Sequence, residues 1–202
     1  MRFHPVQYIH AARGQEHKVT MVTMQVLLLT VVLILPSVEN LSFRNPEYSV
    51  TVDKLLGKWY ITRWAGNPPI PAKKKFSPLP PFIFVKNILG KLEFRMNISK
   101  PMGCVVLKMN MEQERENSGI FYIWPNHRIN IAFIGGMDFA IAYHQSNINN
   151  QLLKMTMLMG KNMTPRPTVI LDFEDFVEFV QLKRTDIINP GFDDSCELFG
   201  ET

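Results

Sequence analysis

Short segments in which apolar and polar residues alternate run through most of the chain. In the clearest one, residues 92–98, four apolar side chains alternate with three polar ones. Successive side chains of a β-strand point to opposite faces, so this alternation predicts a strand with one apolar and one polar face. Asn97 would lie on the polar face, and a glycan attached there would point outward.

The same period of two recurs along the rest of the chain. The segments that show it are separated by turn residues such as Gly135-Gly136 and are predicted to be strands. They are residues 55–64, 92–98, 105–112, 120–124, 128–134, 138–145 and 152–159. Residues 80–88 are apolar at both odd and even positions, so a strand is expected there but its inward face is not assigned.

One stretch has the period of a helix instead. Residues 167–182 carry apolar side chains at spacings of three and four, among them Phe173, Phe176 and Val180, and they predict an amphipathic helix. Eight strands followed by one helix indicate a mainly β fold. We expect an eight-stranded antiparallel up-and-down β-barrel with one C-terminal α-helix packed outside it. A β-sandwich is the alternative on pattern alone.

An apolar run near the N-terminus predicts a secretory signal. Residues 26–35 are almost entirely apolar, and basic residues precede them. This run is too short to cross a bilayer, which needs about 20 residues, so residues 1–38 are expected to be a signal peptide with an N-terminal extension. The mature domain would be residues 39–202, secreted to the extracellular space and without an integral membrane segment. A buried helix of the fold is the alternative.

Composition and charge place the chain among ordinary globular proteins. Of its 202 residues, 46% are apolar and 20% are charged, and the formal net charge is +4. A basic excess this small gives no footprint for nucleic acid, so no nucleic-acid partner is expected. The run Lys73, Lys74, Lys75 is predicted to be a solvated loop, with attraction to a membrane surface as the alternative.

The chain holds only two cysteines, Cys104 and Cys196. In an oxidising secretory compartment they are expected to form one disulfide that ties the C-terminal tail to the domain, with two free thiols as the alternative. Three glycosylation sequons, at Asn40, Asn97 and Asn162, agree with secretion. A proline directly after the third sequon makes glycosylation there less favourable.

Three short motifs resemble, in order and spacing, the signatures of the lipocalin family. Gly57-Lys-Trp59 resembles the family's Gly-x-Trp at the start of the first strand, where the tryptophan closes the bottom of the barrel. Met137-Asp138-Phe139 resembles its Thr-Asp-Tyr signature, with the threonine lost. Met159-Gly160-Lys161 resembles the third signature, in which an arginine after the glycine stacks on that tryptophan.

The resemblance covers residues 50–200 and implies structural roles. Gly57, Trp59, Asp138 and Lys161 would form the motif at the bottom of the barrel, and the two cysteines occupy the positions of a disulfide that many lipocalins share. Lysine can lie over an indole as a cation but lacks the planar guanidinium of arginine, so a looser basal lid is expected. The chain looks most similar to odorant-binding, tear and epididymal secretory lipocalins, to which its stretches 90–94 and 194–198 are also similar.

The resemblance implies a secreted carrier that binds a small hydrophobic molecule, of the odorant, pheromone, retinoid or fatty acid type, in the barrel cavity. The side chains expected to line this cavity are apolar and rich in methionine, which suits ligands of varied shape. A tyrosine hydroxyl within it could orient a polar group of the ligand. The alternative is that these side chains fill the barrel themselves. The residues that alternation and family register send inward are Leu92, Phe94, Met96, Leu107, Met109, Phe121, Ile123, Ile131, Phe133, Ile141, Tyr143, Leu153, Met155 and Met157.

No sequence pattern supports catalysis, and no metal or other cofactor is expected. His127 and His144 are the only histidines after the leader, and no spacing of His, Cys or Asp resembles a zinc site. No Gly-x-Ser-x-Gly or phosphate-binding motif occurs either. The expected partner is a small lipophilic ligand, with a cell-surface receptor as a further candidate, and the protein would be a monomer or weak dimer.

Two other functions stay open from the sequence. The first is a secreted glycoprotein that acts on cells through its outer surface, for instance in a reproductive tract, without a defined ligand. The second is capture of an anionic ligand such as a siderophore, because Arg63 shares the parity of Trp59 and Ile61.

Overall fold

The computed structural model describes residues 49–125 and 127–196. The predicted leader, the sequon at Asn40 and the last six residues lie outside the described part. The described residues all belong to one compact unit, residues 45–202.

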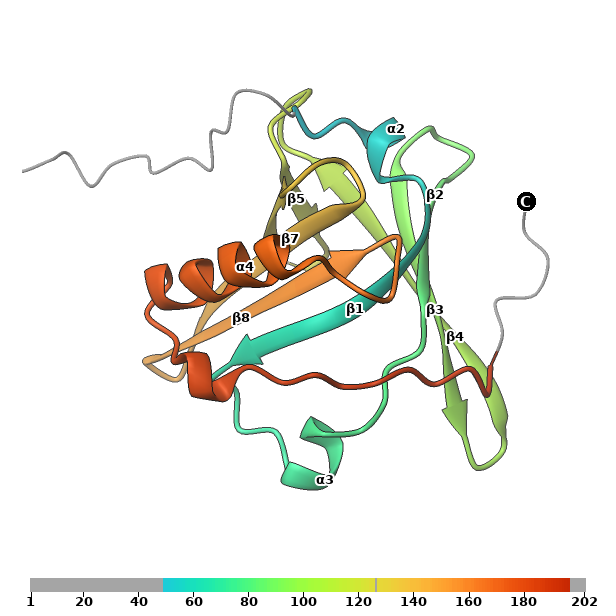
Figure 1. Cartoon of the computed structure of the whole chain (residues 1–202). Coiled ribbons are helices and arrows are strands. Elements are labelled where there is room, and N and C mark those ends of the chain that lie inside the picture. The colour runs from blue at the N-terminus through green and yellow to red at the C-terminus, as the bar shows by residue number, and fades with distance from the viewer. Residues whose placement is uncertain (1–48, 126, 197–202) are drawn as a thin grey trace, which may run out of the picture. The chain divides into compact units, whose positions relative to one another are not determined.

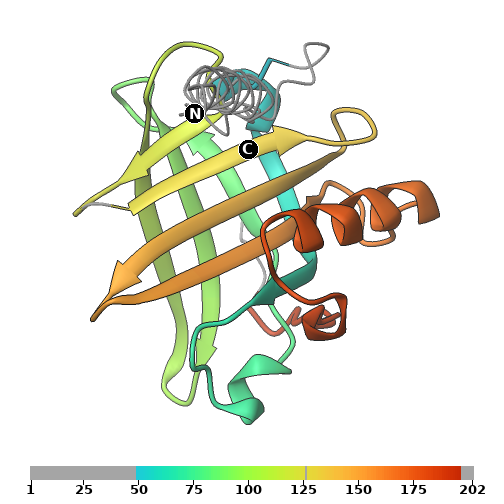
Figure 2. The ribbon, with the colours of Figure 1, turned by 90° about the vertical axis from the view of Figure 1, so that its left-hand side faces the viewer.

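Eight antiparallel strands form a closed barrel in which each strand pairs with the next and the last pairs with the first. This arrangement confirms the predicted up-and-down barrel and rules out the sandwich (Figures 1 and 2). The predicted strand ends differ from the observed ones by a few residues, as is usual for ends that fray. The strands are β1 (Gly57–Gly66), β2 (Phe82–Lys86), β3 (Leu92–Lys100), β4 (Gly103–Gln113), β5 (Ile120–Ile123), β6 (His127–Phe133), β7 (Phe139–Ile148) and β8 (Gln151–Gly160).

Helix α4 (Pro167–Phe179) packs against the outside of the barrel, as the apolar spacing predicted. Its buried face, which includes Phe173 and Phe176, forms one apolar cluster with residues of β7 and β8 such as Leu158. Proline at the first helical position is favourable because its missing N–H has no partner there in any helix. The remaining helices are short: α2 (Val52–Leu55), α3 (Ala72–Lys75) and the 3₁₀ turn η1 (Arg184–Asp186).

Helix α4 ends three residues before the predicted end at residue 182. Gln181 takes a φ of +62°, and the N–H groups of Gln181 and Leu182 donate to the carbonyls of Glu178 and Val177, at 2.8 and 3.0 Å. This pair of bonds is a Schellman cap, which normally uses glycine at the left-handed position. The sequence did not predict this helix end because glutamine, unlike glycine, does not mark a helix C-terminus.

The C-terminal segment returns across the barrel after η1 and covers an open strand edge. β1 pairs with β2 at only three positions, and further along β1 the backbone of Trp64 exchanges hydrogen bonds of 2.8 and 3.0 Å with Ile188. The segment then pairs with Leu79, which precedes β2, and reaches the start of β4 (Figure 1). It is fixed there by the disulfide between Cys104 and Cys196, whose Cα atoms lie 5.8 Å apart. The predicted disulfide is therefore confirmed.

Candidate functional site in the barrel interior

The two ends of the barrel differ. The end that carries α2 is called the closed end. At this end Trp59 is completely buried, and its Nε1 donates a hydrogen bond of 2.6 Å to the carbonyl of Leu55 in α2. The ammonium of Lys161 lies 5.4 Å from the centre of the indole, and the Lys161 backbone N–H donates to the carbonyl of Asp138 at 2.8 Å. The structure thus places Trp59, Asp138 and Lys161 together at the closed end.

Gly57 connects α2 to β1 directly before this tryptophan. Its φ of +105° lies in the region that only glycine adopts readily. A side chain at this position would strain the turn that aims Trp59 under the barrel.

Aromatic rings fill the interior next to Trp59. Phe82 and Phe84 come from β2, the strand whose inward face the sequence left unassigned. Both are buried and pack against half-buried Phe94 of β3. The three ring centres lie 5.0 to 6.0 Å apart, distances at which aromatic pairs attract beyond simple burial. Phe133 adds a further ring 6.5 Å from Trp59. The closed end is therefore a packed floor.

Strand register defines which side chains share the interior face, because directly opposed residues of antiparallel strands lie on the same side. Leu107 opposes Met96, and Met157 opposes both Ala142 and Trp64. Twelve of the fourteen predicted inward residues lie on this face. They are Leu92, Phe94, Met96, Leu107, Met109, Phe121, Ile123, Ile131, Phe133, Leu153, Met155 and Met157.

Exposure of these interior side chains rises away from the floor. Phe121 and Ile131 are buried, whereas Leu107 at the β3–β4 end of the barrel is 39% exposed. Met155 and Met157 keep part of their surface accessible as well. We call this half, which carries α3 and the β3–β4 turn, the open end (Figure 2). Apolar side chains that face a barrel interior yet remain accessible are candidates for contact with a small hydrophobic molecule.

Two predicted ligand-binding residues are corrected by the structure. Ile141 and Tyr143 of β7 point outward into the cluster under α4, where the Tyr143 ring lies 5.8 Å from that of Phe176. Burial raises the pKa of the Tyr143 phenol, and its hydroxyl donates to Gln145 at 2.7 Å. Tyr143 therefore cannot orient a ligand inside the barrel.

The error has a clear physical origin. Because α4 covers the outer face of β7, both faces of this strand are buried near its start, and alternation no longer separates them. The small residues Ala140 and Ala142 face inward, opposite Phe133 and Ile131. Large residues were expected on the inner face, but they belong to the helix contact.

The proposed role of Arg63 in an anionic-ligand site is also wrong. The pairing of β1 with β8 shifts between Ile61 and Arg63, as in a β-bulge, and such a shift exchanges the two faces of a strand. Arg63 opposes Leu158 of the outer cluster, and its guanidinium donates to the carbonyl of Thr62 at 2.7 Å. Trp64 takes the inward position instead.

Several interior residues were not in the predicted set. Trp64 faces inward only because of the bulge, Ile188 arrives with the C-terminal segment, and His144 follows the inward alanines of β7. Phe82 and Phe84 could not be placed because β2 is apolar on both faces. None of these positions has a signal in local spacing.

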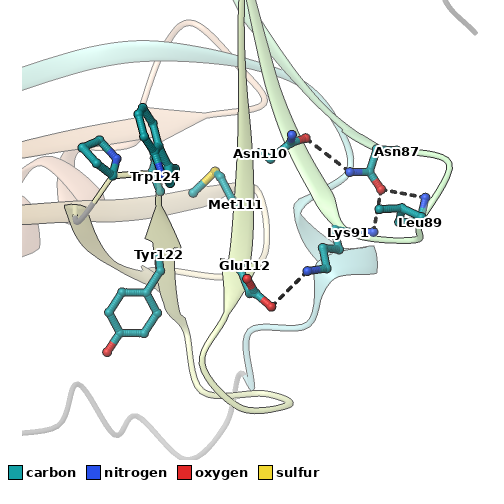
Figure 3. Close-up of a pocket in the computed structure, with 10 residues that line it drawn as sticks. Asn87, Leu89, Lys91, Asn110, Met111, Glu112, Tyr122 and Trp124 are labelled. Carbon is teal, nitrogen blue, oxygen red and sulfur yellow. Dashed lines mark hydrogen bonds and ion pairs between the residues drawn. The ribbon is translucent and has the colours of Figure 1, made fainter.

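A concavity lies outside the barrel, where β4 and β5 separate (Figure 3). It has a volume of about 440 Å³ and is bordered by the β2–β3 turn, β4, and Trp124-Pro125 after β5. Its polar side chains already bind one another: Lys91 pairs with Glu112 at 3.0 Å, and Asn87 donates to Asn110 at 3.2 Å. These groups are satisfied without a ligand, which makes the barrel interior the better candidate site.

The remaining predicted surface features lie on the outside. Asn97 faces outward from β3, opposite Val106, and Asn162 is exposed after β8; their glycosylation stays a prediction. Lys73 and Lys74 are exposed as expected, although they lie in α3 instead of a loop. In the described part of the chain no helix is long and apolar enough to cross a membrane.

No protein-family model and no curated protein matches the sequence. The fold, however, matches 253 chains of solved structures. Among them is the siderocalin Ex-FABP, a protein described as functioning through dual ligand specificities. It superimposes with a TM-score of 0.61 at 15% sequence identity, over 74% of this chain and 97% of that chain.

The barrel has the lipocalin fold. At 15% identity the likeness concerns the path of the backbone, so it does not transfer the neighbour's ligands to this chain. The lipocalin fold and the confirmed disulfide are consistent with the motifs in the sequence.

Proposed function

We propose that the protein is a secreted carrier that binds one small hydrophobic molecule in the open half of its barrel. A single observation carries the proposal: inward-facing apolar side chains remain accessible above a packed floor, with Leu107 39% exposed. Apolar surface in contact with water raises the free energy of the free protein, and a hydrophobic ligand would relieve that cost. The interior wall of the open half is therefore suited to bind a hydrophobic ligand.

The chemistry of the wall favours apolar ligands of varied shape. Met109, Met155 and Met157 line the accessible part, and methionine is flexible and polarizable. Tyr143 points outward, so its phenol does not face the ligand and does not select a polar group on it. Covering about 200 Å² of ligand surface at ~25 cal/mol per Å² gives roughly 5 kcal/mol before the costs of association, so we expect micromolar affinity.

The proposal includes secretion and the absence of catalysis. A disulfide between Cys104 and Cys196 supports an oxidising compartment, in agreement with the leader predicted for residues 1–38. Both cysteines are used in this bond, so neither thiol is available as a nucleophile. Odorants, pheromones, retinoids and fatty acids are the ligand types that fit such a site.

A matched pair of variants on β4 tests the site. Leu107 and Val106 are neighbours and both exposed, but Leu107 faces inward, opposite Met96, and Val106 faces outward, opposite Asn97. Leu107→Trp should fill the opening and weaken binding of a fluorescent hydrophobic probe at least tenfold. Val106→Trp should leave the dissociation constant unchanged, because it adds the same ring to the outer face.

Equal probe affinity in both variants would overturn the proposed site. Absence of saturable, competable binding in the parent protein would overturn the carrier function itself. If the parent protein binds the probe, mass spectrometry of organic extracts from the natively purified protein should identify its natural ligand.

The second candidate is action on cells through the outer surface. Its support is the β1–β2 connection, where Lys73 and Lys74 are exposed next to Phe76, which is 63% exposed. Cations beside an exposed aromatic ring form a plausible contact surface. Replacing Lys73, Lys74 and Lys75 by alanine should reduce cell association if this function holds, and unchanged association would remove its basis.

A further inference from the structure

Two histidines that are separate in the sequence lie side by side on the interior face of the barrel. His127 begins β6 and opposes Ile123, while His144 of β7 opposes the interior residue Ile129. Their ring centres are 5.3 Å apart, and the ring planes make an angle of 64°. The carrier function proposed above does not use this pair.

The spacing of the two rings fits a shared metal ion. Zinc binds imidazole nitrogen at about 2.0–2.1 Å in tetrahedral sites, which places the centres of two coordinated rings about 5 Å apart. We propose that His127 and His144 together bind a divalent transition-metal ion such as Cu²⁺ or Zn²⁺. The pair is formed by strand pairing, so no motif along the chain announces it.

The hydrogen bonding of the rings leaves the required nitrogens available. Nδ1 of His144 lies 2.9 Å from the backbone carbonyl of Arg128. A carbonyl can only accept, so Nδ1 donates in this bond, and in the neutral ring Nε2 then carries the lone pair. Metal-binding histidines usually donate their other N–H in this way, which fixes the ring and makes it more basic. The His127 ring has no hydrogen bond to any described residue.

The two histidines are accessible to solvent. His127 is exposed and His144 half-buried, and the described residues contain no cluster of three or more metal-binding side chains. Two protein ligands therefore leave coordination positions for water or for a donor group of another molecule. Because the ligands are imidazoles, the general order of affinities favours Cu²⁺ over Zn²⁺.

Metal titration of the full chain tests the proposal, with Cu²⁺ or Zn²⁺ alone as the probe and calorimetry as the measurement. The double variant His127→Gln/His144→Gln should bind at least tenfold more weakly, a loss no smaller than that caused by removing an outer-shell partner. His4, His10 and His17 stay in both proteins, so any binding by them cancels in the comparison. Arg128→Ala/Gln145→Ala is the matched control, because it changes the neighbouring residues of opposite parity.

A second measurement does not depend on the variants. Trp124 is 89% exposed in the turn before His127, so in the unmodified protein Cu²⁺ should quench its fluorescence and broaden its indole NMR signal more than that of Trp59. Loss of this effect in the histidine variant, with its retention in the control, supports the site. Equal affinity of parent and histidine variant, equal loss in the control, or no selective effect on Trp124 would overturn it.

Discussion

The closed and open ends of the barrel are built from similar apolar residues but end in different states. Trp59, Phe82 and Phe121 are buried at the closed end, whereas Val105 and Leu107 of β4 are exposed toward the open end. All five belong to strands of one sheet. The alternation of a strand therefore determines which way a side chain points. The elements packed around that side chain determine whether it fills a core or lines a site.

The difference arises from how far the strands pair. β4 pairs with β3 from Gly103 to Met111 but with β5 only from Met111 to Gln113. Residues 103–110 therefore have a neighbouring strand on one side, and their side chains lose the cover that a full wall would give. At the closed end, α2, the phenylalanines of β2 and the side chain of Lys161 supply that cover.

The largest expected effect is the contrast between one substitution at each end. Trp59→Ala should lower the free energy of unfolding by about 3–5 kcal/mol, because it removes a completely buried ring. Leu107→Ala should cost less than about 1 kcal/mol, since its side chain is already accessible. Urea unfolding of both variants measures the difference, and comparable losses would contradict the division into a packed and an open end.

The disulfide should have the next largest effect, acting at the open end. Cys104 and Cys196 close a chain segment of 92 residues, and removing such a link typically lowers stability by about 2–5 kcal/mol. Cys104→Ser/Cys196→Ser should show this loss in denaturant unfolding, while the native fluorescence of buried Trp59 stays unchanged. A loss of Trp59 burial in the native variant would show that the two ends are not separate.

The smallest expected effect concerns the lysine below the floor. Lys161→Ala removes the cation over Trp59 but keeps the backbone hydrogen bond to Asp138, so stability should fall by only about 0.5–1 kcal/mol. Lys161→Arg should restore or exceed the original stability, because a planar guanidinium can stack on the indole. Thermal unfolding measures both; a destabilising arginine would argue against a cation over the ring.

Interior positions were predictable wherever one face of a strand meets water. In β3 and β4 the alternation identified Leu92, Met96 and Leu107 correctly, because their neighbours in the sequence are polar or outward. It failed for Ile141 and Tyr143, because α4 removes water from the outer face of β7. There, burial is decided by a helix that begins more than twenty residues later in the chain.

The sequence by itself determined the number and order of the strands, the outer helix, the residues of the floor motif and the cysteines that pair. The strands and the helix depend on local period, which acts over a few neighbouring positions. The floor motif was implied by the resemblance to the lipocalin family, and the disulfide by the presence of only two cysteines. Only the tertiary structure decided that Arg63 points outward after a bulge, that Ile188 completes the interior, and that His127 meets His144. Such contacts depend on register between distant segments, and register follows from the closed barrel as a whole.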